Sequence, residues 1–248
     1  MFIKRIASFL FLIWGFFVLI SVMILVLPFI LISSAVFRDK QAQDIIFFFL
    51  KIWAWILSIL CYFPVRVQNR HLVNKNKAYI YVCNHSSYLD AVAVVIAIPG
   101  SFKPLGKIEM VKLPIFGLIY KRAVVLIDRK SQESRARSVE ELKAGLSKGQ
   151  SILIFPEGTI NSSSNTLAEF YDGAFRLAIE TQTPLAPFAI KNTGNLFSKN
   201  NPVLARPGLI TCIFDKPVDV SGLGLDDLQA LKEKVYKQIE GLITQDLN

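Results

Sequence analysis

A histidine and an aspartate stand five positions apart, as His85 and Asp90 in Asn84–Asp90 (NHSSYLD), in a chain with only two histidines. On one continuous helix this spacing would turn the two side chains about 140° apart, so they would not meet. They can meet if His85 lies in a turn after a strand and Asp90 lies in the first turn of a helix. Asp90 would then fix the ring tautomer and leave the other nitrogen as a general base. The alternative is a buried histidine that is simply satisfied by a carboxylate.

Two further strand ends carry residues suited to binding an anion. In Phe155–Thr159 (FPEGT), Pro156 stops strand pairing and Gly158 permits close approach to the backbone. Such a turn can present N–H groups to an oxyanion or a phosphate, although a simple tight turn has the same pattern. Arg129 could form paired hydrogen bonds to a phosphate, or a surface ion pair with Asp128. Together, the three strand ends point to one site.

The elements that must position these residues begin near Arg66, where short β-rich runs start to alternate with helical stretches. The expected strands are Ala78–Cys83, Ala123–Ile127, Ser151–Phe155, Pro187–Ile190 and Leu209–Phe214. The expected helices are Ser87–Ile98, Ser131–Lys148, Glu169–Thr181 and Asp226–Ile243. This alternation predicts an α/β domain with a mixed, largely parallel sheet flanked by helices. Ligands of such sheets sit at the carboxyl ends of the strands.

An apolar segment precedes this domain, and residues 6–37 contain no charged side chain. As one helix they would measure roughly 48 Å, more than a bilayer needs, and Pro28 can divide them. A second apolar stretch, Ile45–Val65, contains Lys51 and several aromatic residues. One interpretation is a spanning helix followed by an interfacial helix, and the other is a helical hairpin sunk in one leaflet. We therefore expect membrane-anchoring helices over residues 1–65 and a catalytic domain over residues 66–248.

Composition narrows the class of protein. The 248 residues are 52% apolar and 19% charged, with a formal charge of +9. These values exclude a disordered chain, a collagen-like repeat and a disulfide scaffold. A basic chain with an apolar end is typical of proteins that meet anionic lipid surfaces or phosphorylated substrates. No Lys/Arg-rich run or nucleic-acid motif is present, and the three cysteines fit a reducing compartment and form no metal pattern.

The motifs together resemble those of the glycerolipid acyltransferases. NHSSYLD is similar to their NHxxxxD box, and the order and spacing of the other boxes match across roughly residues 79–190. These other segments are VVLIDR, FPEGT, Pro184–Phe188 and, between the first two boxes, Lys107–Met110. The resemblance is strongest to the bacterial 1-acyl-sn-glycerol-3-phosphate acyltransferases, which make phosphatidic acid.

The resemblance implies a mechanism. His85, oriented by Asp90, would take the proton from the 2-hydroxyl of lysophosphatidic acid, whose oxygen attacks the thioester of acyl-CoA or acyl-carrier protein. Arg129 and Lys107 would hold the phosphate. The acceptor site would also include Glu157, Gly158 and Thr159.

The same resemblance implies no metal and no cofactor beyond the acyl donor. The apolar segment would hold the site at the lipid bilayer, at the inner membrane of the cell, with the active site facing the cytoplasm. Nucleic acid is not an expected partner.

One position departs from the family pattern. The third box usually continues with an arginine that binds phosphate, and here Ile160 occupies that place. Another cation would have to substitute, from the set Lys103, Lys107, Lys121, Arg122 and Lys191. Alternatively, the acceptor is another lyso-lipid, such as a lysophospholipid with a larger head group or a lyso-ornithine lipid. A thioesterase, and a non-catalytic membrane adaptor that would tolerate His85→Ala, are the hypotheses from other classes.

Overall fold

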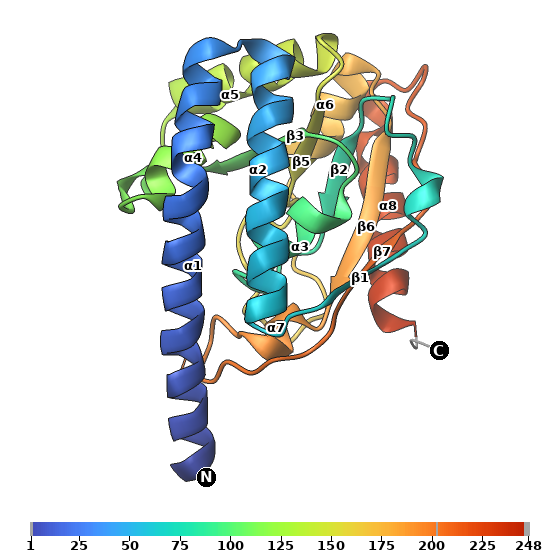
Figure 1. Ribbon diagram of the computed structural model, residues 1–248. Coiled ribbons are helices and arrows are strands. Elements are labelled where there is room, and N and C mark those ends of the chain that lie inside the picture. The colour runs from blue at the N-terminus through green and yellow to red at the C-terminus, as the bar shows by residue number, and fades with distance from the viewer. Residues whose placement is uncertain (1, 202, 246–248) are drawn as a thin grey trace.

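The computed structural model describes residues 2–201 and 203–245, which form one seven-stranded sheet with helices on both faces (Figure 1). The strand order is β1-β7-β6-β2-β5-β3-β4. All neighbouring pairs are parallel except β6 and β7. The strands are β1 (Val65–Gln68), β2 (Ile80–Cys83), β3 (Phe102–Lys107), β4 (Val125–Ile127), β5 (Ser151–Ile154), β6 (Leu185–Lys191) and β7 (Ile210–Phe214). The predicted mixed, largely parallel α/β fold is confirmed.

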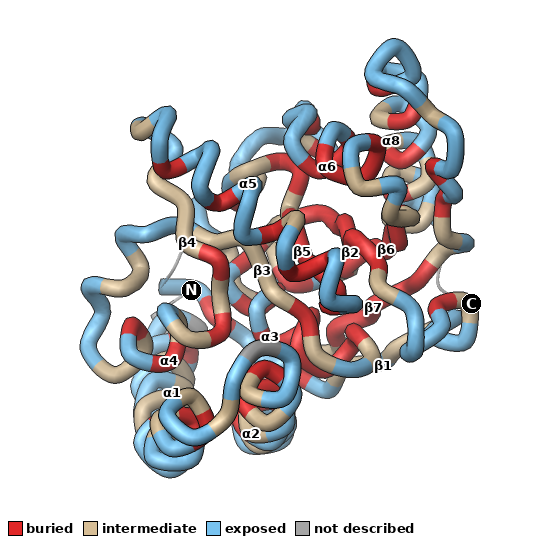
Figure 2. The backbone as a smooth tube through the Cα atoms, turned by 90° about the horizontal axis from the view of Figure 1, so that it is seen from above, coloured by how far each residue is buried: buried red, intermediate tan, exposed pale blue. Residues whose placement is uncertain are grey.

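The helices divide between the two faces of the sheet, as the view from above shows (Figure 2). One face is covered by α1 (Phe2–Val36), α2 (Asp39–Leu60), α3 (Asp90–Ala97) and α4 (Phe116–Ala123). The other is covered by α5 (Gln132–Ser147), α6 (Gly173–Thr181) and α8 (Leu228–Thr244). The remaining short helices are α7 (Thr193–Leu196), η1 (Arg70–Leu72), η2 (Ile108–Lys112) and η3 (Leu225–Asp227).

Strand β2 shows why two cores form. Its side chains alternate, so Tyr81 and Cys83 join the core under α1 to α4, whereas Ile80 and Val82 join the core under α5, α6 and α8. All four are buried. A strand that is buried on both faces lies in the middle of the sheet. The carboxyl end of β2 is therefore flanked by the ends of neighbouring strands, at the edge where ligands of such sheets bind.

Several predicted boundaries need correction. The strand expected at Ala123–Ile127 begins at Val125, because Ala123 is the last residue of α4. The helix expected from Glu169 begins at Gly173. Strand β3 and helix α4 were not predicted at all. Pro28 does not divide α1, since the helix continues through it, and Phe29 stacks on Phe49 of α2 at 4.7 Å.

Helices α1 and α2 form an antiparallel hairpin that lies along the α/β domain (Figure 1). Near the start of α1, the Ser8 hydroxyl donates to the carbonyls of Val203 and Ala205 at 2.9 and 2.7 Å. Near its end, Ser34 accepts a hydrogen bond from Arg122 at 2.9 Å. The hairpin and the domain therefore share one continuous apolar core. The expected division after residue 65 falls at the first residue of β1.

Candidate active site

The structure brings His85 and Asp90 together at the carboxyl end of β2. His85 lies in the irregular segment after β2, and Asp90 is the first residue of α3. Its Oδ2 lies 2.8 Å from His85 Nδ1. The same oxygen accepts the backbone N–H groups of Ser86 and Ser87 at 2.7 and 2.9 Å. Asp90 is fully buried, whereas the His85 side chain is 21% exposed.

This arrangement prepares the imidazole for proton transfer. Nδ1 faces a carboxylate, so the neutral ring carries its proton there and its lone pair on Nε2. Within residues 2–201 and 203–245, no hydrogen bond to Nε2 is formed. The ring also stacks on Phe155, with centroids 4.1 Å apart and planes 19° apart. A ring held on two sides can present Nε2 in one direction.

The loop that carries the pair is tied to the neighbouring strand ends. The Asn84 side chain donates to the Ile190 carbonyl at 2.8 Å and accepts the Ile190 N–H at 2.7 Å. The Ser87 hydroxyl donates to the carbonyl of Phe197 at 2.6 Å. The Asn84 contacts extend the β2–β6 pairing past the last strand residue, and the Ser87 contact ties the loop to the end of α7, so the loop leaves the sheet in a fixed direction.

The Phe155–Thr159 segment lies directly beside His85, and both carboxylate oxygens of Glu157 accept hydrogen bonds from main chain. Its Oε1 accepts the His85 N–H at 2.7 Å, and its Oε2 accepts the Ala168 N–H at 2.8 Å. Only 2% of Glu157 is exposed, and this burial raises the pKa of its carboxyl while the two N–H donors oppose the shift. Both carboxylate oxygens of Glu157 therefore face main-chain N–H groups. Thr159 is exposed.

Gly158 leaves room for a cation beside the turn because it has no side chain. Its φ of +70° favours glycine, and a Cβ built there would lie 2.8 Å from the Tyr171 ring and 3.4 Å from Arg129 Nη1. Arg129 is exposed, as is Lys107, which ends β3. Strands β3, β4 and β5 are adjacent and parallel, so their carboxyl ends share the edge where His85 lies. Arg129 and Lys107 can thus offer charge at this edge.

Ile160, which stands where the family pattern has arginine, is buried. Three of the possible substitute cations are engaged elsewhere. Lys103 lies 3.5 Å from Glu141, Arg122 binds Ser34 and the Leu118 carbonyl, and Lys191 binds the Gln245 carbonyl. Lys107 and Lys121 are the remaining members of the set, and of these two Lys107 lies at a strand end, that of β3.

Two tyrosines lie at the site although no pattern in the sequence predicted them there. Tyr171 is 70% exposed and covers Gly158. The Tyr120 hydroxyl lies so close to Gly106 that a side chain at position 106 would displace it. Burial is the main reason that the pKa of Tyr120 rises to about 12, and the nearby Arg129 opposes the rise. These rings lie beside Gly158 and Gly106 only in the folded chain, because each glycine is distant from its tyrosine in the sequence.

The described residues contain no group of three or more His, Cys, Asp or Glu side chains that could hold a metal ion. The three cysteines are free and buried. In the part of the chain described here, acid–base chemistry and anion binding are the capacities that the site residues offer.

Comparison with known proteins agrees with this geometry. A family model described as Acyltransferase matches residues 64–191, just over half of the chain. The chain is 30% identical over 188 residues to a 1-acyl-sn-glycerol-3-phosphate acyltransferase of Cocos nucifera, covering 75% of this chain and 56% of the relative. It is 30% identical over 173 residues to 1-acyl-sn-glycerol-3-phosphate acyltransferase alpha of Mus musculus, covering 69% and 60%. The chain thus spans little more than half the length of these relatives.

A solved structure has the same fold. The crystal structure of the 1-acyl-sn-glycerophosphate (LPA) acyltransferase PlsC from Thermotoga maritima superposes with a TM-score of 0.81 at 21% identity, and the match covers 99% of this chain and 100% of that one. The family match contains the His85–Asp90 loop, the Arg129 strand end and the Glu157–Gly158 turn. The chain therefore belongs to the acyltransferase family.

Proposed function

We propose that this acyltransferase moves a fatty acyl group from acyl-CoA or acyl-carrier protein to the sn-2 hydroxyl of lysophosphatidic acid, giving phosphatidic acid. The observation that carries the proposal is the 2.8 Å contact between His85 Nδ1 and Asp90 Oδ2 at an open strand end. The names of the relatives support the acceptor and the product. Lys107 and Arg129, both exposed at neighbouring strand ends, support a phosphate-bearing acceptor.

The chemistry balances without a covalent enzyme intermediate. His85 Nε2 removes the proton from the 2-hydroxyl as its oxygen attacks the thioester carbonyl carbon. The tetrahedral intermediate collapses, the carbon–sulfur bond breaks, and the thiolate leaves with the proton that His85 holds. Asp90 stabilises the imidazolium between these two proton transfers, and its own contacts with Ser86 and Ser87 keep it in place.

We propose further that residues 1–65 anchor the enzyme in one leaflet, with residues 66–248 as the catalytic domain. Both α1 and α2 contain segments long and apolar enough to cross a membrane, Arg5–Val36 and Lys40–Leu60. The domain, however, contacts α1 from Ser8 to Ser34, about 39 Å of helix. A helix crossing a hydrocarbon core of about 30 Å would carry the polar domain into it.

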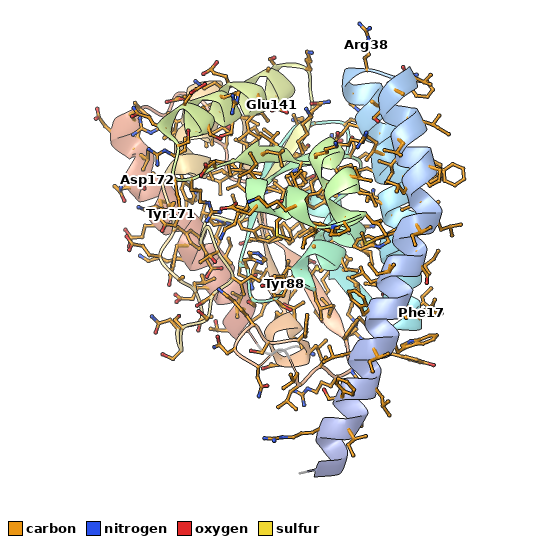
Figure 3. All side chains as sticks on the ribbon, turned by 90° about the vertical axis from the view of Figure 1, so that its left-hand side faces the viewer. Phe17, Arg38, Tyr88, Glu141, Tyr171 and Asp172 are labelled. Atoms are coloured by element: carbon orange, nitrogen blue, oxygen red, sulfur yellow. The ribbon has the colours of Figure 1, made fainter. Side chains whose placement is uncertain are left out.

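The outer surface of the hairpin supports the same placement. Large apolar side chains are exposed along α1, and Phe17 lies on the side that faces away from the domain (Figure 3). Among residues 5–36 of α1, the large apolar side chains that are exposed are Ile6, Phe9, Leu10, Ile13, Trp14, Phe16, Phe17, Ile24, Leu25, Phe29, Ile32 and Val36. A patch of this extent is typical of a membrane contact. In the cell we expect the inner membrane and its cytoplasmic side, where both acyl donors are found.

The decisive experiment is acyl transfer from a radiolabelled palmitoyl thioester, as CoA and as carrier-protein ester. Lysophosphatidic acid, lysophosphatidylcholine and lyso-ornithine lipid are offered side by side. We expect product with lysophosphatidic acid, loss of that product in His85→Ala, and full activity in His71→Ala, which removes the other, exposed histidine. Product with a different acceptor alone would reject the proposed substrate. No product with any acceptor and donor would reject the enzyme and favour an adaptor.

A further inference from the structure

The main chain of His85 is held as tightly as its ring, and by a segment far away in the sequence. Its N–H donates to Glu157 Oε1, and its carbonyl accepts the Asn161 N–H, both at 2.7 Å. The Phe155 ring stacks on the imidazole from the same segment. Residues 155–161 therefore contact His85 at three separate points.

These contacts replace a strand ladder that has ended. Strands β2 and β5 pair in parallel as far as Val82 and Ile154, and neither strand continues to His85. Without a neighbouring carbonyl, the N–H of His85 would have no acceptor in the fold. The Glu157 side chain supplies that acceptor from the turn after β5. A side chain that satisfies a main-chain donor fixes the backbone locally.

Glu157 is itself anchored at its second oxygen. The Ala168 N–H donates to Oε2 at 2.8 Å, and the residue is almost completely buried. The carboxylate therefore bridges two main-chain segments, the His85 loop and the segment that leads to α6. Each of its oxygens accepts a hydrogen bond from one of these donors, and the burial of the side chain keeps it away from the exposed edge where an acceptor would bind.

We propose that Glu157 is a positioning residue for the general base, holding the His85 backbone so that Nε2 points at the acceptor hydroxyl, and that it does not bind the acceptor. The inference rests on the proposed function of His85. It deepens that function, because it assigns to the FPEGT turn a role in directing the base. The same turn also contributes Gly158, next to Arg129, so base and cation are aligned by one short segment.

Two substitutions test separately the two properties of the Glu157 side chain that the bridge requires, which are two acceptor oxygens and sufficient length. Glu157→Gln keeps the size of the side chain but offers one acceptor oxygen and one N–H₂ donor, so one of the two main-chain donors loses its partner. Glu157→Asp keeps the charge but is shorter by one methylene and cannot reach both donors. Both variants should break the bridge that fixes the His85 backbone, by different routes.

The test combines turnover with a direct view of the imidazole. Because the chain has two histidines, histidine-selective ¹³C and ¹⁵N labelling in detergent micelles gives two ring signals, assigned with His71→Ala. In Glu157→Gln and in Glu157→Asp we expect the His85 signal to shift and broaden, and the His71 signal to stay. We expect kcat to fall about 10- to 100-fold, the range typical of a misplaced catalytic group, with KM for donor and acceptor within about twofold of wild type. Glu133→Gln, on the exposed side of α5, is the matched control and should change neither signal.

The opposite split would overturn the proposal. An unchanged His85 signal, with a raised KM for lysophosphatidic acid and an unchanged kcat, would mean that Glu157 binds the acceptor. If one variant fails to fold, the other gives the same two readouts. The ring signals are recorded without substrate, so they still decide the positioning role if wild-type enzyme transfers acyl groups to none of the acceptors. That result would reject the proposed function separately.

Discussion

Around His85, several buried polar side chains are hydrogen-bonded to main chain, whereas the hairpin meets the domain mostly through apolar side chains. Asp90 and Glu157 each accept two backbone N–H groups, and Asn84 exchanges two hydrogen bonds with Ile190. In the hairpin, the polar contacts to the domain lie near its ends, as at Ser8 and Gln43. Between these ends lies a wide apolar interface.

The difference follows from what each region has to achieve. Hydrogen bonds are directional, so a network of them holds a catalytic atom to within a fraction of an ångström. Apolar burial is not directional and scales with area, so in the proposed anchoring it would set which side of the molecule meets lipid. Changes at the sheet edge should therefore alter turnover, and changes on the outer hairpin surface should alter where the enzyme resides.

The largest effect should come from Asp90→Asn. The amide cannot hold the imidazolium as a carboxylate does and favours the wrong tautomer, so we expect kcat to fall about 10²- to 10⁴-fold. Turnover is measured with the labelled thioester, and circular dichroism checks the fold. Asp226→Asn, an exposed carboxylate in η3, should leave kcat unchanged. Full activity in Asp90→Asn would remove the dyad from the mechanism.

The next effect concerns location. Replacing Phe16 and Phe17, which are 65% and 62% exposed, with serine removes about 1.5–3 kcal/mol of apolar transfer each. We expect about 10²-fold weaker binding to vesicles with anionic lipid, measured by co-sedimentation, and unchanged turnover of a water-soluble short-chain acceptor. Leu225→Ser, an exposed apolar residue in η3, is the control. Undiminished vesicle binding by the double variant would place the lipid contact on another surface.

A pair of glycines separates backbone strain from a crowded site. Gly158 and Gly222 have φ angles of +70° and +78°, but nothing lies within 4 Å of a Cβ at Gly222. Alanine at either position should cost about 1–2 kcal/mol of stability. Gly158→Ala should also push Tyr171 and Arg129 apart and lower kcat/KM for the acceptor about 10-fold, the equivalent of about 1.4 kcal/mol. Equal kinetics for the two variants would exclude a role for this turn in acceptor binding.

The smallest effect on catalysis should come from the polar contact that Gln43 of α2 makes with the domain. Gln43 is buried, and its Nε2 donates to the Phe102 and Ala123 carbonyls at 2.9 and 3.1 Å. Gln43→Ala should lower the free energy of unfolding by about 1–3 kcal/mol, because two buried carbonyls lose their donor. Urea unfolding in micelles measures this, with exposed Gln132→Ala as the control. A drop in kcat at full stability would show that the hairpin also acts on the site.

The fold was predictable where local pattern and final structure agree. Strands β2, β5 and β7 are apolar, rich in β-branched residues and bounded by turn-forming residues, and each was predicted to within two residues at either end. Strand β3 reads as FKPLGK, and Pro104 and Gly106 both argue against a strand. It forms because β4 and β5 pair with its two sides, and no local pattern reports such pairing.

The site was predictable to a similar degree. The five-residue spacing and the expected strand-to-helix boundary were enough to bring His85 to Asp90. The direction of the Glu157 side chain was not, because its partners belong to β2 and to the segment before α6. Tyr171 likewise covers Gly158 only once α6 has packed on the sheet.

The pairing of β1 with β7 has a consequence for how the enzyme is made. Strand β1 follows the hairpin directly, yet its partner β7 is the last strand among the described residues, in the register Val65 to Ile210. As the ribosome releases the chain, the hairpin emerges before the sheet, and under the proposed anchoring its exposed aromatic surface would enter lipid while most of the sheet is still unsynthesised. Contacts between such distant residues form late and slowly. On the proposed function, membrane capture would therefore precede assembly of the catalytic edge, and a nascent chain would be bound to the bilayer before it can act there.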